Sequence, residues 1–487
     1  MRRALVSCLL LALLGGSSAM VAGRERPAVV DATPDTTADA TADATADATP
    51  GDAGPAAAAT PSTTRASTRA APRGPVGLRV VASSWELVTP GIVMNRGAEP
   101  APGSQFDAVG LRVSFAAASD TAGLESRLGR GGDVVDGADL ALMPLPTFIA
   151  SYERLRALSP QVFFVIGWSR GADVLTGDAA VLRRGAPGKA RFVLDAHRGS
   201  AEGMLGLFAL AHAGVASSRV EFGDAHGAAL HARVRRRSGE IDARDVVLST
   251  ADAVHLVPIV AVAPRGTLTT KRDALVEFMR VWQAGARQLA QDPAGATRLV
   301  AAQVGAPEAV DLIDALGWLE FADLGEAAAA SGLAGRRAAR LDVLFTDGWS
   351  LLRDAGVLAT PAPEQPPVSA VVMAALVAVD RRRGEGSAAV PHRWAPTPAK
   401  AQALLTRRFD DVLSSREAEA KLVRELGLLA DVFARSRIRI TVRTDASVAK
   451  DLVARAAERF GLQHDQFEVR RGRTGDATAI VEVLPAT

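Results

Sequence analysis

Short β-rich runs alternate with helical patterns from residue 78 onward, and this alternation constrains the fold more than any other feature of the chain. The clearest runs occupy 78–82, 111–115, 140–143, 163–166, 192–194 and 256–262. Helical patterns lie between most of them, and strands that alternate with helices indicate a mostly parallel sheet. The sequence therefore predicts an α/β fold.

One helical pattern is clearer than the others because its large apolar side chains share one face. They are Leu275, Phe278, Met279, Trp282 and Leu289. The helix should end before Asp292, because Pro293 cannot continue it. Such a stripe indicates core packing rather than a ligand surface. With 487 residues, 48% of them hydrophobic, the chain is long enough for at least two cores.

The N-terminus has the pattern of a secretory signal peptide, which we expect at 1–19. Arg2 and Arg3 form its charged region, 5–14 its apolar core and 17–19 a small-residue cleavage site, so the protein should be periplasmic. The apolar run is too short to cross a bilayer, and no later apolar run is long enough, so we do not expect a transmembrane protein. The only cysteine lies inside the signal, so the exported chain should carry no disulfide.

Composition divides the rest of the chain. Residues 20–75 are mainly Ala, Thr, Asp, Pro and Gly, which cannot bury enough apolar surface to offset the entropy of ordering, so they should form a disordered tether. Residues 76–360 carry the alternating pattern. Proline-rich and glycine-rich stretches then predict a linker at 361–400.

Residues 401–487 form a second, smaller α/β unit. A capping box of Ser414 and Glu417 opens a helix with an apolar side. Strict alternation of apolar and polar residues predicts a half-buried strand at 438–442. A helix at about 447–459 follows, with further strands near 467–469 and 479–483.

Short motifs follow one another in a fixed order between 78 and 358. They are Ser83-Ser84-Trp85 after the first strand, a small-residue segment at 137–141, a crossover at 168–173, a strand opening at 188–192, Arg198-Gly199-Ser200 before a helix, and a return segment at 249–253. In this order they resemble the periplasmic solute-binding proteins of nitrate/sulfonate/taurine ABC transporters. The resemblance implies a type II periplasmic-binding-protein fold, with lobe I at about 76–172 and 253–360 and lobe II at about 173–252.

The resemblance also implies a ligand held between the lobes, where loops after parallel strands bind small molecules in α/β folds. The cleft-lining candidates are Ser84, Trp85, Thr147, Arg170, Ser200 and Asp252. Arg170 can pair with an anionic head group, and a Gly-Ser turn that opens a helix offers backbone donors to an anion. Two alternatives stay open: Arg170 can form an interlobe salt bridge, and Trp85 can belong to the core.

Lobe II departs from the family pattern. Between 220 and 248 the family has a strand and a segment that usually supplies ligand contacts, and this chain offers only 226–237 and 239–243. The arginines at 233–237 most simply form a solvated helix face.

The C-terminal unit resembles the OmpA-like peptidoglycan-binding domain, whose Thr-Asp pair matches Thr444-Asp445. Asp445 and Arg455 are the peptidoglycan-binding candidates. The chain departs from the family here as well: Arg455 comes too late in its helix, and the family's later Asn-Arg-Arg segment is absent. Asp445 can then be only a helix N-cap.

The sequence lacks the motifs that would indicate nucleic-acid binding, catalysis or metal binding. The net charge of +2 is not gathered in one basic stripe, so we expect no nucleic-acid partner. No nucleophile elbow, His-Glu-x-x-His helix, cysteine pair or phosphate loop occurs, and the seven histidines are scattered, so we expect no enzyme, cofactor or metal site.

Two function classes remain. In the first, the protein captures a small solute for an ABC permease, and an anion is one candidate for that solute. The C-terminal unit would then associate the protein with peptidoglycan. In the second, a degenerate binding module acts as a periplasmic scaffold or wall-associated interaction protein.

Overall fold

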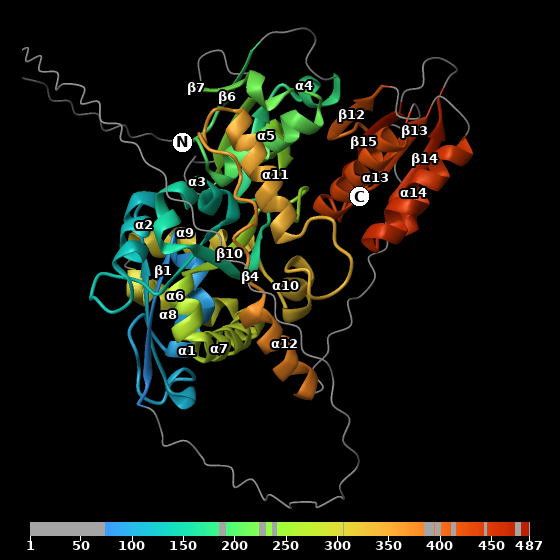
Figure 1. Cartoon of the computed structure of the whole chain (residues 1–487). Helices are drawn as coiled ribbons and strands as arrows, with labels where there is room; N and C mark the ends of the chain where they lie inside the picture. The colour runs from blue at the N-terminus through green and yellow to red at the C-terminus, as the bar shows by residue number, and fades with distance from the viewer. Residues whose placement is uncertain are drawn as a thin grey trace, which may run out of the picture. The chain divides into compact units, whose positions relative to one another are not determined.

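The computed structural model describes residues 74–184, 191–223, 230–235, 241–304, 306–383, 394, 401–410, 415–442, 446–472 and 479–486. These residues belong to one compact unit, and their strands form three sheets (Figure 1). The predicted signal peptide and nearly all of the predicted tether lie outside the described residues, so both remain predictions.

The first sheet has the strand order β11-β4-β10-β3-β1-β2. β1 has parallel neighbours β2 and β3, whereas β10 is antiparallel to β3 and β4, and β11 is antiparallel to β4. Four of the predicted runs lie within its strands, and the predicted run at 256–262 begins two residues before β10. The strands are β1 (Val76–Ala82), β2 (Leu111–Ala117), β3 (Leu140–Pro144), β4 (Pro160–Ser169), β10 (Pro258–Pro264) and β11 (Leu319–Phe321).

Helices pack around this sheet, and α7 is the longest of those described here. All five apolar side chains predicted to face the core from α7 are buried, and the helix ends at Gln291, just before Pro293. A Cβ atom at Gly285 would lie 2.3 Å from the carbonyl oxygen of Pro90, so glycine permits the close packing of α7 on α1. The helices are α1 (Thr89–Asn95), α2 (Thr121–Arg130), α3 (Leu145–Leu155), α6 (Arg265–Thr270), α7 (Arg272–Gln291), α8 (Pro293–Val304), α9 (Ala306–Gly317), α10 (Leu324–Ala330), α11 (Leu341–Asp354) and α12 (Val371–Arg383).

The second sheet has the order β7-β6-β8-β5-β9. β6 is parallel to β7 and β8, and β5 is antiparallel to β8 and β9. Helix α5 (Ala201–His212) packs on β5 and β8, and its residues 201–210 are all buried. The remaining elements are β5 (Asp173–Gly177), α4 (Ala179–Arg184), β6 (Phe192–Asp195), β7 (Val220–Gly223), β8 (Leu230–Val234) and β9 (Val246–Ser249).

The basic run in this lobe is not a helix face. Arg233 lies in β8 and forms an ion pair with Asp195 of β6, while 236 and 237 lie outside the described residues. The ordinary pairing of β8 with β5 and β6 replaces the predicted helix, because the strand buries Leu230 and Ala232 on one side.

Two crossovers join the first two sheets, from β4 to β5 and from β9 to β10. They are bonded to each other at Thr250, which is fully buried: its Oγ1 lies 2.8 Å from Oγ of Ser169 and accepts a hydrogen bond of 2.8 Å from the backbone N–H of Gly171. The predicted two-lobed α/β fold with two crossovers is confirmed.

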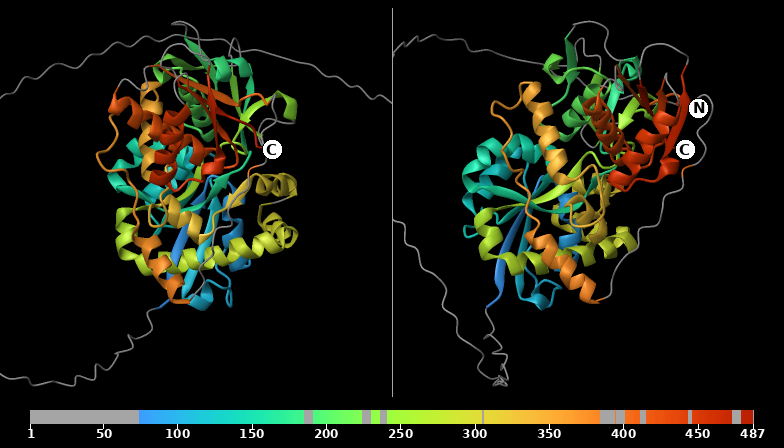
Figure 2. Two further views of the ribbon diagram at one scale, coloured as in Figure 1. Left: turned by 90° about the vertical axis from the view of Figure 1, so that its right-hand side faces the viewer. Right: turned by 45° about the vertical axis from the view of Figure 1, so that its right-hand side comes forward.

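The third sheet belongs to the C-terminal unit and has the order β12-β15-β13-β14. Helices α13 and α14 lie side by side (Figure 2). Ser415 caps α13 by accepting a hydrogen bond from the backbone N–H of Ala418, whereas the predicted cap Ser414 lies outside the described residues. The predicted small α/β unit is confirmed; its OmpA-like character stays a prediction. Its elements are β12 (Leu405–Phe409), α13 (Arg416–Val432), β13 (Ile438–Val442), α14 (Ala446–Phe460), β14 (Phe467–Arg471) and β15 (Ala479–Val483).

Candidate functional site

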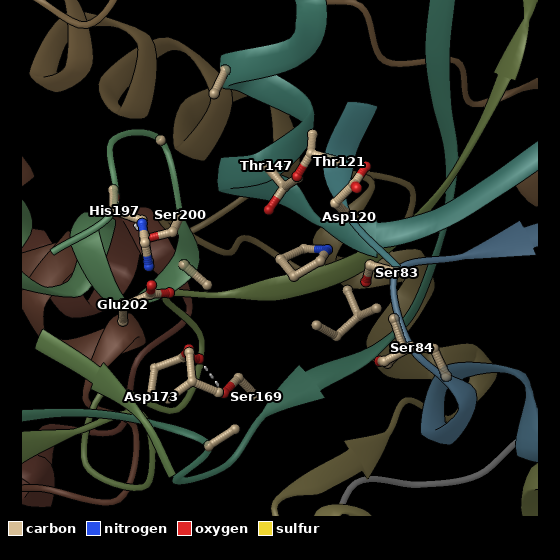
Figure 3. A pocket seen from close by; sticks show the side chains of 18 of the residues that line it. Ser83, Ser84, Asp120, Thr121, Thr147, Ser169, Asp173, His197, Ser200 and Glu202 are labelled. Atoms are coloured by element: carbon tan, nitrogen blue, oxygen red, sulfur yellow. Dashed lines mark hydrogen bonds between the residues drawn. The ribbon is translucent and has the colours of Figure 1, made fainter. Parts of the chain in front are cut away.

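A cavity of about 460 Å³ lies between the two lobes. Three parallel strands of the first sheet direct their carboxyl ends toward it. Ser83 and Ser84 follow β1, Asp120 and Thr121 follow β2, and Thr147 lies in the first turn of α3, directly after β3 (Figure 3). This is where open α/β sheets bind small molecules, and the volume suits a small solute.

Lobe II supplies the opposite wall, from the segment between β6 and α5 (Figure 3). Ser200 caps α5: its hydroxyl accepts a hydrogen bond of 3.1 Å from the N–H of Gly203 and donates one of 2.8 Å to the carbonyl oxygen of His197. Glu202, in the first turn of α5, is only 6% exposed and also lines the cavity. The N-terminus of α5 therefore has a carboxylate of the chain beside it.

Asp173 lies where the first crossover enters β5, and it is 4% exposed. One of its carboxylate oxygens accepts a hydrogen bond of 2.6 Å from Oγ of Ser169 (Figure 3). Burial raises the pKa of Asp173 to about 7, the negative charge of Glu202 acts in the same direction, and the hydroxyl of Ser169 opposes it. The carboxyl group is therefore poised to gain or lose a proton near neutral pH.

Three of the six predicted cleft residues line this cavity, namely Ser84, Thr147 and Ser200. The other three, Trp85, Arg170 and Asp252, do not, which corrects their predicted place in the cleft.

Each of these three side chains has a different local reason for lying outside the cavity. Trp85 packs, partly buried, against the core, as the alternative interpretation held. Asp252 caps its own turn by accepting hydrogen bonds from the backbone N–H and the hydroxyl of Ser249. Nε of Arg170 lies 2.6 Å from Glu320, which is in β11 beside β4, so this pair lies within the first lobe rather than between the lobes.

Sequence reasoning missed the two buried acids of the cleft. Asp173 ends the same crossover motif that drew attention to Arg170, and Glu202 follows Ser200 by two residues. Their position was the available signal, because each carboxylate lies in or beside a predicted cleft segment. Asp173 is the first residue of a strand, and Glu202 lies in the first turn of an apolar helix.

Of the two peptidoglycan candidates in the C-terminal unit, only Arg455 belongs to the part of the chain that the structure describes. Arg455 forms ion pairs of 3.0 Å with both Glu419 and Asp451, and Asp445 lies outside the described residues. Within the described part of the chain, no cluster of three or more His, Cys, Asp or Glu residues could hold a metal ion. No helix there combines the length and the apolar character that crossing a membrane requires.

No protein-family model and no curated protein sequence matches the chain. Similar solved structures include the periplasmic sulfonate-binding protein SsuA of a putative sulfonate ABC transporter from Methylobacillus flagellatus KT, at 12% identity over 66% of this chain and 99% of that chain, with a TM-score of 0.41. The alkanesulfonate-binding protein SsuA from Xanthomonas axonopodis pv. citri, bound to MOPS, is 12% identical over 63% and 99%, with a TM-score of 0.39. The periplasmic nitrate-binding protein NrtA from Synechocystis PCC 6803 is 9% identical over 47% and 66%, with a TM-score of 0.32.

The fold class follows from the chain's own topology. Two α/β lobes, two crossovers tied to each other at Thr250 and a cavity between the lobes define a periplasmic-binding-protein fold.

Proposed function

We propose that this protein captures a small solute by closing its two lobes around the cleft, without transforming it chemically. The observation that carries the proposal is the convergence of polar side chains from both lobes on one cavity, at the carboxyl ends of three parallel strands. In this proposal the two crossovers, which are bonded to each other at Thr250, act as the hinge for the closure.

The finer proposal follows from the sequence. An N-terminal signal would place the protein in the periplasm, where it would deliver its solute to an ABC permease. The similar solved structures carry the names of sulfonate-binding and nitrate-binding proteins, so that class of solute belongs in the first screen.

The cavity also bears on the alternative, a degenerate module that acts as a scaffold. Side chains that filled the cleft would favour the scaffold, and here about 460 Å³ stays open. Association with the cell wall remains a prediction. Its candidate residue Arg455 already forms ion pairs with Glu419 and Asp451.

A thermal-shift screen of the full chain tests the proposal, with nitrate, alkanesulfonates, taurine, bicarbonate, phosphate and soluble peptidoglycan fragments. A solute present at about 100 times its Kd should stabilise the protein by about 2.7 kcal/mol. The shift should shrink in Thr147→Val, which removes a cleft hydroxyl, and persist in Thr346→Val, the same change at an exposed position of α11. A panel without any shift, or a shift with wall fragments alone, would contradict capture in the cleft.

A further inference from the structure

The lining of the cleft is richer in carboxylates than in cations. Four acidic residues line the cavity: Glu86, Asp120, Asp173 and Glu202. The basic residues of the lining are Arg154, Arg198 and His197. Arg154 is already engaged, because Glu125 accepts two hydrogen bonds from its guanidinium group, of 2.8 and 2.6 Å. The balance of charge around the cavity is therefore negative.

Asp173 and Glu202 differ from the other acids of the cleft in being almost fully buried. They are 4% and 6% exposed, and the negative charge of Glu202 acts on Asp173. Asp120, by contrast, has a structural role, since it caps α2 by accepting a hydrogen bond of 2.7 Å from the N–H of Gly123. Asp173 and Glu202 thus form a distinct pair in the wall of lobe II, which we call the acid pair.

Neither carboxylate of the acid pair forms an ion pair within the described part of the chain, although His197 and Arg198 line the same cavity. The hydroxyl of Ser169 donates to Asp173, and the N-terminus of α5 lies beside Glu202. Neither is a full positive charge, and a buried carboxylate without a cation is expensive to ionise. Both carboxylates line a cavity wide enough for a solute, so a cation can reach them from the cleft.

We propose that the solute carries a protonated amine, which binds between the carboxylates of Asp173 and Glu202. This inference rests on the proposed function and names the chemistry of its ligand. An ammonium group donates up to three hydrogen bonds, which suits two carboxylates that line one cavity. The hydroxyls of Ser84 and Thr147 on the opposite wall then receive the other end of the solute (Figure 3).

Calorimetric titration of the full chain with matched solutes tests the amine directly. The pairs share a skeleton and differ only in an amine or a hydroxyl: taurine and isethionate, 4-aminobutyrate and 4-hydroxybutyrate, putrescine and 1,4-butanediol. We expect at least one amine to bind and its alcohol to bind roughly 10- to 100-fold more weakly, because the alcohol leaves the carboxylates without a charged donor.

Two variants and a control locate the effect. Asp173→Asn and Glu202→Gln should each weaken the amine at least tenfold and leave the affinity for its alcohol nearly unchanged. Asp354→Asn removes the same charge from a residue that does not line the cavity and whose side chain is 52% exposed, and it should change neither affinity. Since the two variants are independent, misfolding of one leaves the other as the test.

The possible outcomes distinguish a failure of the amine proposal from a failure of solute capture. If an alcohol or simple anion binds as tightly as its amine, and the variants bind it normally, the amine proposal is overturned while solute capture stands. If no member of the panel binds, solute capture itself fails for these solutes, and the amine proposal with it.

Discussion

Two buried carboxylates of this protein have nearly equal exposure and opposite surroundings. Asp173, in the cleft, is 4% exposed and has the hydroxyl of Ser169 as its donor. Asp431, in α13, is 6% exposed and accepts hydrogen bonds of 3.2 and 3.1 Å from Arg337, with Nδ1 of His255 3.2 Å away. Burial tends to raise the pKa of Asp431, but the hydrogen bond with His255 and the charge of Arg337 outweigh it and hold that pKa well below its usual range.

The difference shows which buried charge is structural. The partners of Asp431 all come from the chain and include the backbone N–H of Ala339 at 2.8 Å, so this carboxylate ties the C-terminal unit to segments of the first lobe. Asp173 has a similar degree of burial without a cation, and its side chain lines a cavity. A buried acid that the fold leaves without a cation is a candidate for ligand binding, and one that the fold neutralises is not.

The largest effect on stability should come from removing the charge of Asp431, the carboxylate that the fold neutralises. Asp431→Asn removes the charge that compensates Arg337, whose side chain is 14% exposed, and should lower the free energy of unfolding by about 3–5 kcal/mol. Urea denaturation at pH 7.5 measures the change. A variant as stable as the wild type would show that this ion pair contributes nothing to the fold, and the contrast with Asp173 would lose its meaning.

The same substitution in the cleft should act in the opposite direction. Because burial raises the pKa of Asp173 from 3.8 to about 7, the folded state holds a proton that the unfolded state has lost, so wild-type stability falls as the pH rises between these values. Asp173→Asn abolishes this loss and should stabilise the protein by up to about 4 kcal/mol at pH 8 and very little at pH 4. Denaturation of both proteins across this range measures the difference; equal stability at pH 8 would mean that ionised Asp173 is well solvated.

A smaller effect is expected at the cap of α5 in the cleft wall. Ser200→Ala leaves the backbone N–H of Gly203 without its acceptor and should destabilise the protein by about 1 kcal/mol. Thermal unfolding measures it, with Ser350→Ala in α11 as the control, because that hydroxyl only donates back to the carbonyl oxygen of Thr346. A loss no greater than that of the control would show that another group satisfies the N-terminus of α5.

Much of the fold is predictable because its signals are local. Alternating apolar residues place β13, a single apolar stripe places α7, and Pro293 ends that helix. β8 escapes prediction because it leads directly into a run of arginines that resembles a solvated helix face. No local pattern reveals that Arg233, within β8, pairs with Asp195 of a strand distant in the sequence.

The site is predictable only in part for the same reason. Ser84, Thr147 and Ser200 follow from their place after strands or before a helix. The role of an arginine depends instead on which acidic residue its long side chain pairs with. Arg170 pairs with Glu320, which lies 150 residues further along the chain. The acid pair depends on the absence of such a partner, which only the packed structure can show.

The smallest effect should come from an exposed ion pair, which completes the comparison. Arg455 is 43% exposed and pairs with Glu419 and Asp451 at the surface of the C-terminal unit. Solvent and salt screen such pairs, so Arg455→Ala should lower the free energy of unfolding by less than about 1 kcal/mol, with a smaller change still in 1 M NaCl. Urea denaturation at both salt concentrations measures this. A loss as large as that of Asp431→Asn would mean that exposure does not separate structural from dispensable charges here, and burial would then no longer distinguish the acid pair of the cleft.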